Sequence, residues 1–121
     1  IAFMEAILMP IPSWEVFPPD MKETFQAFRT PDVGWDMIVN NHVFVEQVLP
    51  SAIVRKMTDA EMDHYRSPYI DPSTRKPLWR WPNEIPVAGK PADVVAAVEA
   101  YNAKLQQSDL PKILFLVHRG H

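Results

Sequence analysis

Apolar residues occur in this chain as uninterrupted runs near its two ends and as spaced positions between them. The runs Ile1–Met4 and Ile113–Val117 contain no polar residue, which is typical of parallel strands that are covered on both faces. The first run stops at Glu5, which would place one carboxylate at the carboxyl end of a sheet strand, where α/β proteins bind ligands. The pattern predicts two buried parallel strands and makes Glu5 the first candidate functional residue.

The spaced apolar positions between the two runs predict several helices. Met21, Phe25 and Phe28 recur at helical spacing after Pro18 and Pro19, which suit the start of a helix. Further helices are expected over residues 32–39, 43–49 with an end at Pro50, 59–66 and 91–107.

Two local patterns inside this middle region carry separate signals. Thr58 and Glu61 fit a capping box, which begins a helix at Asp59. The segment from Ser67 to Pro91 is rich in proline and contains the aromatic stretch Leu78–Pro82, which favours turns and irregular chain packed on an apolar surface. We expect this segment to be lid-like.

The order of elements is strand, helical insertion, long helix, strand, and it predicts an α/β fold. The long helix would make the crossover between two parallel strands, and the insertion would cover the ligand site at Glu5. Each strand lacks the neighbours that a stable parallel sheet has, so we expect a piece of a larger domain.

Composition and charge narrow the class of protein. The chain has 121 residues, 47% of them hydrophobic and 22% charged, as in globular proteins. A net charge of -3 gives no basic field for nucleic acid, and no apolar run reaches the roughly 20 residues that cross a bilayer. With no cysteine, we expect a soluble protein of the bacterial cytoplasm, with a periplasmic location left open.

The isolated ionisable residues give weak signals. His42 and His64 lack the spacing and companions of a metal site, so we expect solvated or capping roles and no metal. The arginines are expected at the surface or in ion pairs: Arg29, Arg55, Arg66, Arg75 and Arg80. Taken alone, a residue such as Glu5 is more often an ordinary charge at a strand end that meets solvent.

Five sequence blocks at near-constant spacing carry a resemblance to a known family. These are Ile1–Glu5, Phe25–Arg29, Phe44–Pro50, Glu61–Arg66 and Trp81–Gly89. Together they resemble the haloalkane dehalogenases of the α/β-hydrolase fold. The resemblance implies a partial α/β-hydrolase fold, with residues 1–8 as a strand of the main domain, 9–90 as a helical cap, and 91–121 as the crossover helix and next strand.

The resemblance also implies a reaction. An aspartate displaces halide from a haloalkane, and a histidine-activated water hydrolyses the aspartyl ester to an alcohol, without a cofactor. Glu5 matches the acid that orients that histidine. The nucleophile, the halide-binding residues and the catalytic histidine would lie outside this chain, which should be inactive alone and need the remainder of the hydrolase domain.

The resemblance further implies the residues that line the substrate cavity. A neutral halogenated aliphatic substrate calls for an apolar, aromatic wall. The matching positions are Phe17, Met21, Phe25, Phe28, Phe44, Val48, Ala52, Trp81, Pro82 and Ile85. For the phenylalanines of the helices, simple core packing stays an equal alternative.

Two other classes of function stay open at this point. A related enzyme of the same fold, such as an epoxide hydrolase or a coelenterazine-type luciferase, would share the scaffold. Paired lid tyrosines would favour the epoxide hydrolase, and Tyr65 and Tyr69 are the lid tyrosines here. A non-catalytic binding fragment is the third reading, although the open edges of two lone strands argue against it.

Overall fold

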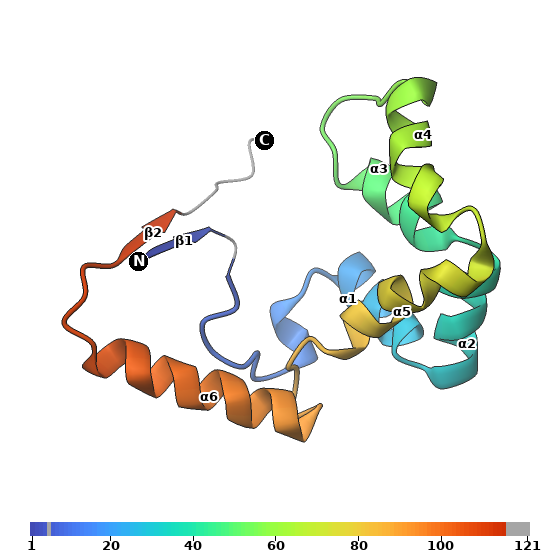
Figure 1. The fold of residues 1–121 in the computed structure, drawn as a ribbon. Helices are drawn as coiled ribbons and strands as arrows, with labels where there is room; N and C mark the ends of the chain where they lie inside the picture. The colour runs from blue at the N-terminus through green and yellow to red at the C-terminus, as the bar shows by residue number, and fades with distance from the viewer. Residues whose placement is uncertain (5, 116–121) are drawn as a thin grey trace. The chain divides into compact units, whose positions relative to one another are not determined.

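The computed structural model describes residues 1–4 and 6–115, and it divides into two compact units (Figure 1). The strand unit combines Ile1–Val16 with Pro86–His121, and the helical unit is Phe17–Ile85. Each unit is described by itself below. None of the helices in the described part of the chain has both the length and the apolar content that crossing a membrane requires.

The strand unit contains a parallel pair of short strands. Strand β1 (Ala2–Met4) pairs with β2 (Ile113–Phe115) in the register Ala2 to Ile113, Phe3 to Leu114 and Met4 to Phe115. Helix α6 (Ala92–Gln107) lies between them in the sequence and begins directly after Pro91. The predicted order of strand, crossover helix and parallel strand is therefore confirmed.

Side chains of α6 attach this helix to the segment that follows β1. The Tyr101 hydroxyl donates a hydrogen bond to the carbonyl of Ile7, and the Asn102 amide donates one to the carbonyl of Leu8 at 2.6 Å. Val98 is the buried residue of this helix. A short 3-10 turn, η1 (Trp14–Val16), completes this unit.

The strand faces are more exposed than predicted. Met4 is 67% exposed, and all three residues of β2 are exposed. The prediction of two buried strands is wrong for this structure, because the described residues contain a sheet of two strands, and such a pair leaves both faces and both outer edges uncovered.

The helical unit is a succession of short helical segments joined by tight turns. Two of them, η2 and η3, are π-helical and bond each amide to the carbonyl five residues back, which widens the turn. In chain order the segments are α1 (Pro19–Phe28), α2 (Pro31–Trp35), η2 (Asp36–Asn40), η3 (Phe44–Val48), α3 (Leu49–Ser51), α4 (Asp59–Arg66), η4 (Ser67–Tyr69), η5 (Pro72–Arg75) and α5 (Lys76–Asn83).

Local chemistry explains where several of these helices begin. Helix α4 begins with the predicted capping box, in which the Thr58 hydroxyl accepts from the Glu61 amide at 3.3 Å and the Thr58 amide donates to Glu61 Oε2 at 2.8 Å. Helices α1 and α2 have proline in their first turn, where an amide donor is not needed. These starts are confirmed as predicted.

The proline-rich segment departs from the prediction. Residues Lys76–Asn83 form helix α5 and are not irregular chain. Pro77 stands in the first turn, and Pro82 comes so late that it removes only one of the last amide donors. The same reasoning applies to Pro50, which was expected to end a helix and instead lies inside α3, where the π-helical turn passes into an α-helical one.

Gly34 allows α2 to pack tightly against the end of α1. A Cβ atom at this position would lie 2.0 Å from the carbonyl oxygen of Phe28, which is far inside a van der Waals contact. The α1–α2 turn therefore requires glycine. It fixes the position of Phe28, whose side chain is fully buried in the core of the helical unit.

Candidate functional site

Five aromatic residues of the predicted pocket form one connected cluster, which we call the aromatic cluster: Phe17, Phe25, Phe28, Phe44 and Trp81. Phe25 has its ring centroid 6.3 Å from that of Phe17 and 5.9 Å from that of Phe28. Phe44 lies 6.1 Å from Phe28 and 5.9 Å from Trp81, and Trp81 lies 6.5 Å from Phe25. Most of these pairs meet edge to face, the geometry that aromatic quadrupoles favour.

The members of this cluster differ in how much of each side chain is exposed. Phe28 is fully buried, while Trp81 is 57% exposed. Phe17, Phe25 and Phe44 are partly exposed. Phe28 therefore packs in the core, whereas Trp81 presents a large apolar face outside it, so core packing and wall formation are both represented in one cluster.

The other predicted pocket residues all belong to the same helical unit. Pro82 is buried beside Trp81 in α5, and Ala52 is exposed just after α3. Met21, Val48 and Ile85 are half-buried. Their role at a substrate remains a prediction. Glu5 lies outside the described residues, so its predicted role also remains a prediction.

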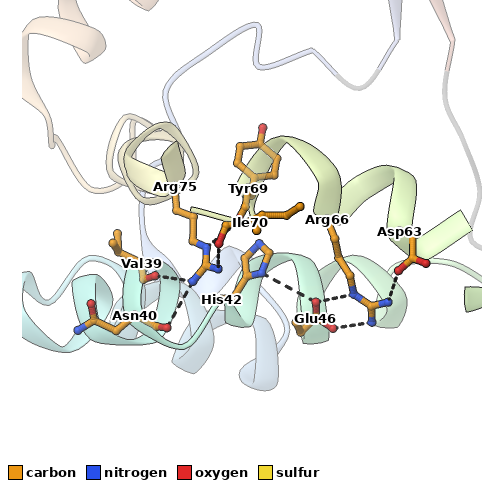
Figure 2. A network of polar contacts seen from close by, with 9 residues as sticks. All are labelled: Val39, Asn40, His42, Glu46, Asp63, Arg66, Tyr69, Ile70 and Arg75. Atoms are coloured by element: carbon orange, nitrogen blue, oxygen red, sulfur yellow. Dashed lines mark hydrogen bonds and ion pairs between the residues drawn. The ribbon is translucent and has the colours of Figure 1, made fainter. Parts of the chain in front are cut away.

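A second group of residues forms the polar network of the helical unit, drawn in Figure 2. At its centre, Arg75 is only 9% exposed and donates to the carbonyls of Val39 at 2.9 Å, Tyr69 at 2.8 Å and Ile70 at 3.1 Å, with a longer contact of 3.4 Å to Asn40. The prediction that Arg75 is a surface or ion-pairing residue is wrong. Its guanidinium instead satisfies backbone acceptors at the ends of η2 and η4.

His42 stands next to Arg75 in the polar network (Figure 2). It is 9% exposed and has a φ of 55°, in the left-handed region that asparagine, aspartate and histidine tolerate best among residues other than glycine. Its ring stacks edge-on against Tyr69, and its Nε2 has no hydrogen-bond partner among the described residues. The expected solvated or capping role for His42 is therefore wrong.

Burial and nearby charges disfavour the protonated form of the His42 imidazole. Burial, and then the positive charges of Arg75 and Arg66, lower the pKa of His42 below its ordinary 6.5, while Glu46 opposes them in part. His42 Nδ1 lies 3.9 Å from Glu46 Oε1, beyond a direct hydrogen bond. A proton on His42 would therefore lie next to the positive charge of Arg75 within the same network.

Glu46 and Arg66 close the network with a two-pronged ion pair. Arg66 donates from Nε to Glu46 Oε1 at 2.7 Å and from Nη2 to Oε2 at 2.8 Å, and its Nη1 reaches Asp63 at 3.0 Å (Figure 2). These bonds lower the pKa of Glu46. The prediction of ion-pairing arginines is confirmed for Arg66, and also for Arg55 and Arg80.

A hollow of about 340 Å³ lies between the end of α3 and helix α4. Its lining includes Pro50, Ile53 and Met62 together with the charged Arg55 and Lys56. None of the predicted pocket residues lines this hollow. We therefore place the candidate site at the aromatic cluster, whose uncharged rings suit a neutral apolar ligand better than a charged rim does.

In the part of the chain that the structure describes, no three histidine, aspartate or glutamate side chains come together as a metal ion would require. The apolar and aromatic character of the candidate site points to binding of an uncharged organic molecule.

Comparison with known proteins gives consistent matches along the whole chain. A haloalkane dehalogenase of Sphingobium indicum is 43% identical over 122 aligned residues, which include 100% of this chain and 40% of the relative. One of Mesorhizobium japonicum is 48% identical, with 95% of this chain and 38% of the relative covered. This chain is homologous to part of a haloalkane dehalogenase. No protein-family model matches it.

The structural comparison agrees with the haloalkane dehalogenase assignment. The crystal structure of haloalkane dehalogenase DbeA from Bradyrhizobium elkani matches with a TM-score of 0.87 and 45% identity, over 93% of this chain and 39% of that one. The predicted partial α/β-hydrolase fold with a helical insertion is confirmed. The chain spans about two fifths of the length of the curated haloalkane dehalogenases it matches.

Proposed function

We propose that this chain is the cap-bearing segment of a haloalkane dehalogenase that converts haloalkanes to alcohol and halide. The observation that supports this most is the aromatic cluster, because the five aromatic positions expected of a halocarbon pocket gather in one place. Identity of 43% over the full chain supports the same proposal.

The proposed division of labour follows the resemblance. Residues 1–8 and 91–121 belong to the main hydrolase domain, and residues 9–90 form the cap. Glu5 orients the catalytic histidine, which lies elsewhere in the hydrolase domain together with the aspartate nucleophile. An aspartyl ester forms as halide leaves. Water that gives a proton to the histidine then hydrolyses the ester, which releases the alcohol and regenerates the aspartate.

The cap residues contribute binding and exclusion of water. A neutral halogenated aliphatic molecule offers no charge for recognition, so contact with aromatic and aliphatic side chains supplies most of its binding free energy. Exclusion of water also strengthens the electrostatic stabilisation of the departing halide. The partners of the chain in this proposal are that substrate and the remainder of the hydrolase domain, in the bacterial cytoplasm.

The proposal is tested by halide release from the full-length protein that carries this segment. We expect release from a brominated or chlorinated alkane, and we expect Glu5→Gln to reduce kcat by roughly a hundredfold or more, since loss of the orienting acid in a comparable triad costs about ten-thousandfold. Glu99→Gln, at an exposed site on α6, is the matched control and should leave turnover unchanged.

Two outcomes would contradict this proposal. Absence of halide release by a folded wild-type protein would remove the dehalogenase assignment. Full turnover in Glu5→Gln, with halide release intact in the wild type, would remove only the role of Glu5.

A further inference from the structure

Helices α1 and α5 provide three members of the aromatic cluster and are joined at their carboxyl ends. Phe25 and Phe28 come from α1 and Trp81 comes from α5, and the two helices are in contact (Figure 1). The angle between these helices therefore decides how the Trp81 ring meets the two phenylalanines. Whatever holds the helix ends together also holds this part of the predicted substrate wall.

Arg29 makes a polar link between the two helix ends. It is the residue that follows α1, and its Nη1 donates to the carbonyl of Ile85 at 2.6 Å and to the carbonyl of Pro82 at 3.1 Å. The last carbonyls of a helix lack partners within the helix, and a cation is favoured at that end. One guanidinium thus satisfies two acceptors at the carboxyl end of α5.

Asn83 makes a weaker link in the opposite direction. Its amide donates to the carbonyl of Trp79 within α5 at 2.8 Å and reaches the carbonyl of Phe28, the last residue of α1, at 3.4 Å. Each helix end therefore receives a donor from the other helix. The arginine is the stronger of the two links, because its bonds are charge-assisted and its shorter one is 2.6 Å long.

The surroundings of Arg29 are consistent with a fixed position. Its side chain is partly buried, and that burial lowers the pKa of Arg29, with a smaller opposing effect from Glu84. The acceptors belong to Pro82, which is buried next to Trp81, and to Ile85, itself a predicted wall residue. A displaced guanidinium would leave carbonyls without a donor directly behind the wall.

We propose that Arg29 is a positioning residue that sets the Trp81 side of the substrate wall by tying the end of α1 to the end of α5. This inference rests on the proposed function for the identity of the substrate. Arg29 itself belongs behind the wall and acts through Trp81, Pro82 and Ile85. A correctly placed wall binds an apolar substrate, so a loosened link should weaken substrate binding first.

The test compares Arg29→Gln with Arg80→Gln in the full-length protein. Both variants lose one positive charge near the end of α5, but Arg80 is exposed and pairs with Glu84, the residue that caps the carboxyl end of its own helix. We expect Arg29→Gln to lower kcat/KM for a haloalkane by roughly tenfold, mostly through KM, as misplacement by about 1 Å can cost a hundredfold. Arg80→Gln should change kcat/KM less than about twofold.

A conservative variant separates positioning from simple stability. Arg29→Lys keeps a cationic donor, although without the planar fork, and should recover part of the lost kcat/KM. The inference is overturned if Arg29→Gln lowers the melting temperature while KM and kcat of the folded protein stay at wild-type values. Equal losses in Arg29→Gln and Arg80→Gln would also overturn it, because charge alone would then explain the effect.

Tryptophan fluorescence keeps this test independent of the proposed function. The difference between each protein and its Trp81→Phe counterpart isolates the emission of Trp81, which should shift in Arg29→Gln and stay unchanged in Arg80→Gln. If the wild type releases no halide but this shift occurs, the proposed function fails and the link between α1 and α5 stands. An unchanged Trp81 emission in Arg29→Gln would overturn the positioning role.

Discussion

The aromatic cluster and the polar network are built from the same helical unit but hold it together in opposite ways. The π-helical turn η3 contributes to both, with Phe44 in the cluster and Glu46 in the network. In the cluster, apolar rings gather and Trp81 keeps more than half of its surface exposed. In the network, the buried Arg75 donates to a backbone carbonyl, and an ion pair joins Arg66 to Glu46 (Figure 2).

This difference separates a surface suited to binding from one suited to holding the fold. An exposed aromatic surface stabilises a structure only when a substrate or another part of the protein packs on it and removes it from water. A buried hydrogen bond adds only a little stability over the bonds that the same groups make to water. Removal of one partner, however, leaves the other unsatisfied and lowers the stability strongly. Truncation should therefore mainly alter binding at the exposed cluster and stability at the network and the buried core.

The largest effect on stability is expected at Phe28, where the cluster joins the core. Phe28→Ala in the full-length protein should lower the free energy of unfolding by about 3–5 kcal/mol, because Phe28 is fully buried and contacts Phe25 and Phe44. Urea unfolding followed by circular dichroism measures the change. Val54→Ala, at a fully exposed apolar residue, is the control and should stay within about 0.5 kcal/mol.

A loss below about 1 kcal/mol in Phe28→Ala would contradict the core position of this ring. A large loss in Val54→Ala would instead show that the face around Val54 is covered in the complete protein. Either result would change which residues are assigned to the core and which to the binding surface.

The next largest effect is expected at the centre of the polar network. Arg75→Met keeps much of the apolar stem but removes the donors to the carbonyls of Val39, Tyr69 and Ile70. Leaving buried carbonyls without donors should lower the free energy of unfolding by about 2–3 kcal/mol. The measurement is the midpoint of urea unfolding, with Arg55→Met, at an exposed ion pair, as the control.

If Arg75→Met and Arg55→Met lower the free energy of unfolding by equal and small amounts, water replaces the Arg75 guanidinium at its acceptors. The polar network would then be a surface feature, and the contrast with the aromatic cluster would disappear.

How well the sequence predicts a feature of this structure depends on how close together in the sequence the interacting residues lie. The capping box at Thr58 and Glu61 was predicted because both partners lie within one turn. The parallel strand pair followed from unbroken apolar runs, and the aromatic positions followed from the family resemblance. These features depend on side-chain type and spacing, which a sequence displays directly.

The features that sequence failed to predict depend on the backbone of distant segments. Arg75 donates to the carbonyl of Val39, 36 residues away, and every residue has such a carbonyl, so no side-chain pattern marks the partner. Burial of His42 follows from the same arrangement. The prolines around helix α5 predict irregular chain, but a proline in the first turn of a helix removes no bonded amide, and the position of that turn is not visible in the sequence.

The smallest expected effect is a pH dependence that belongs to His42 in the network. Its pKa is lowered in the folded state by burial and by Arg75 and Arg66, against the opposing charge of Glu46. Between that lowered pKa and the ordinary 6.5, the unfolded chain binds more protons than the folded one. The contribution of His42 to the free energy of unfolding is therefore fully present above pH 6.5 and decreases as the pH falls. Tyr69 packs on the same ring, and Nε2 has no hydrogen-bond partner among the residues that the structure describes.

His42→Asn should therefore remove part of the slope of unfolding free energy against pH as the pH falls below 6.5. Asparagine tolerates the left-handed backbone at this position, so the substitution changes the ionisable group with little strain. His64→Asn, at an exposed site on α4, is the matched control. A steeper slope in His42→Asn than in the parent would mean that protonated His42 stabilises the network, most directly by drawing closer to Glu46.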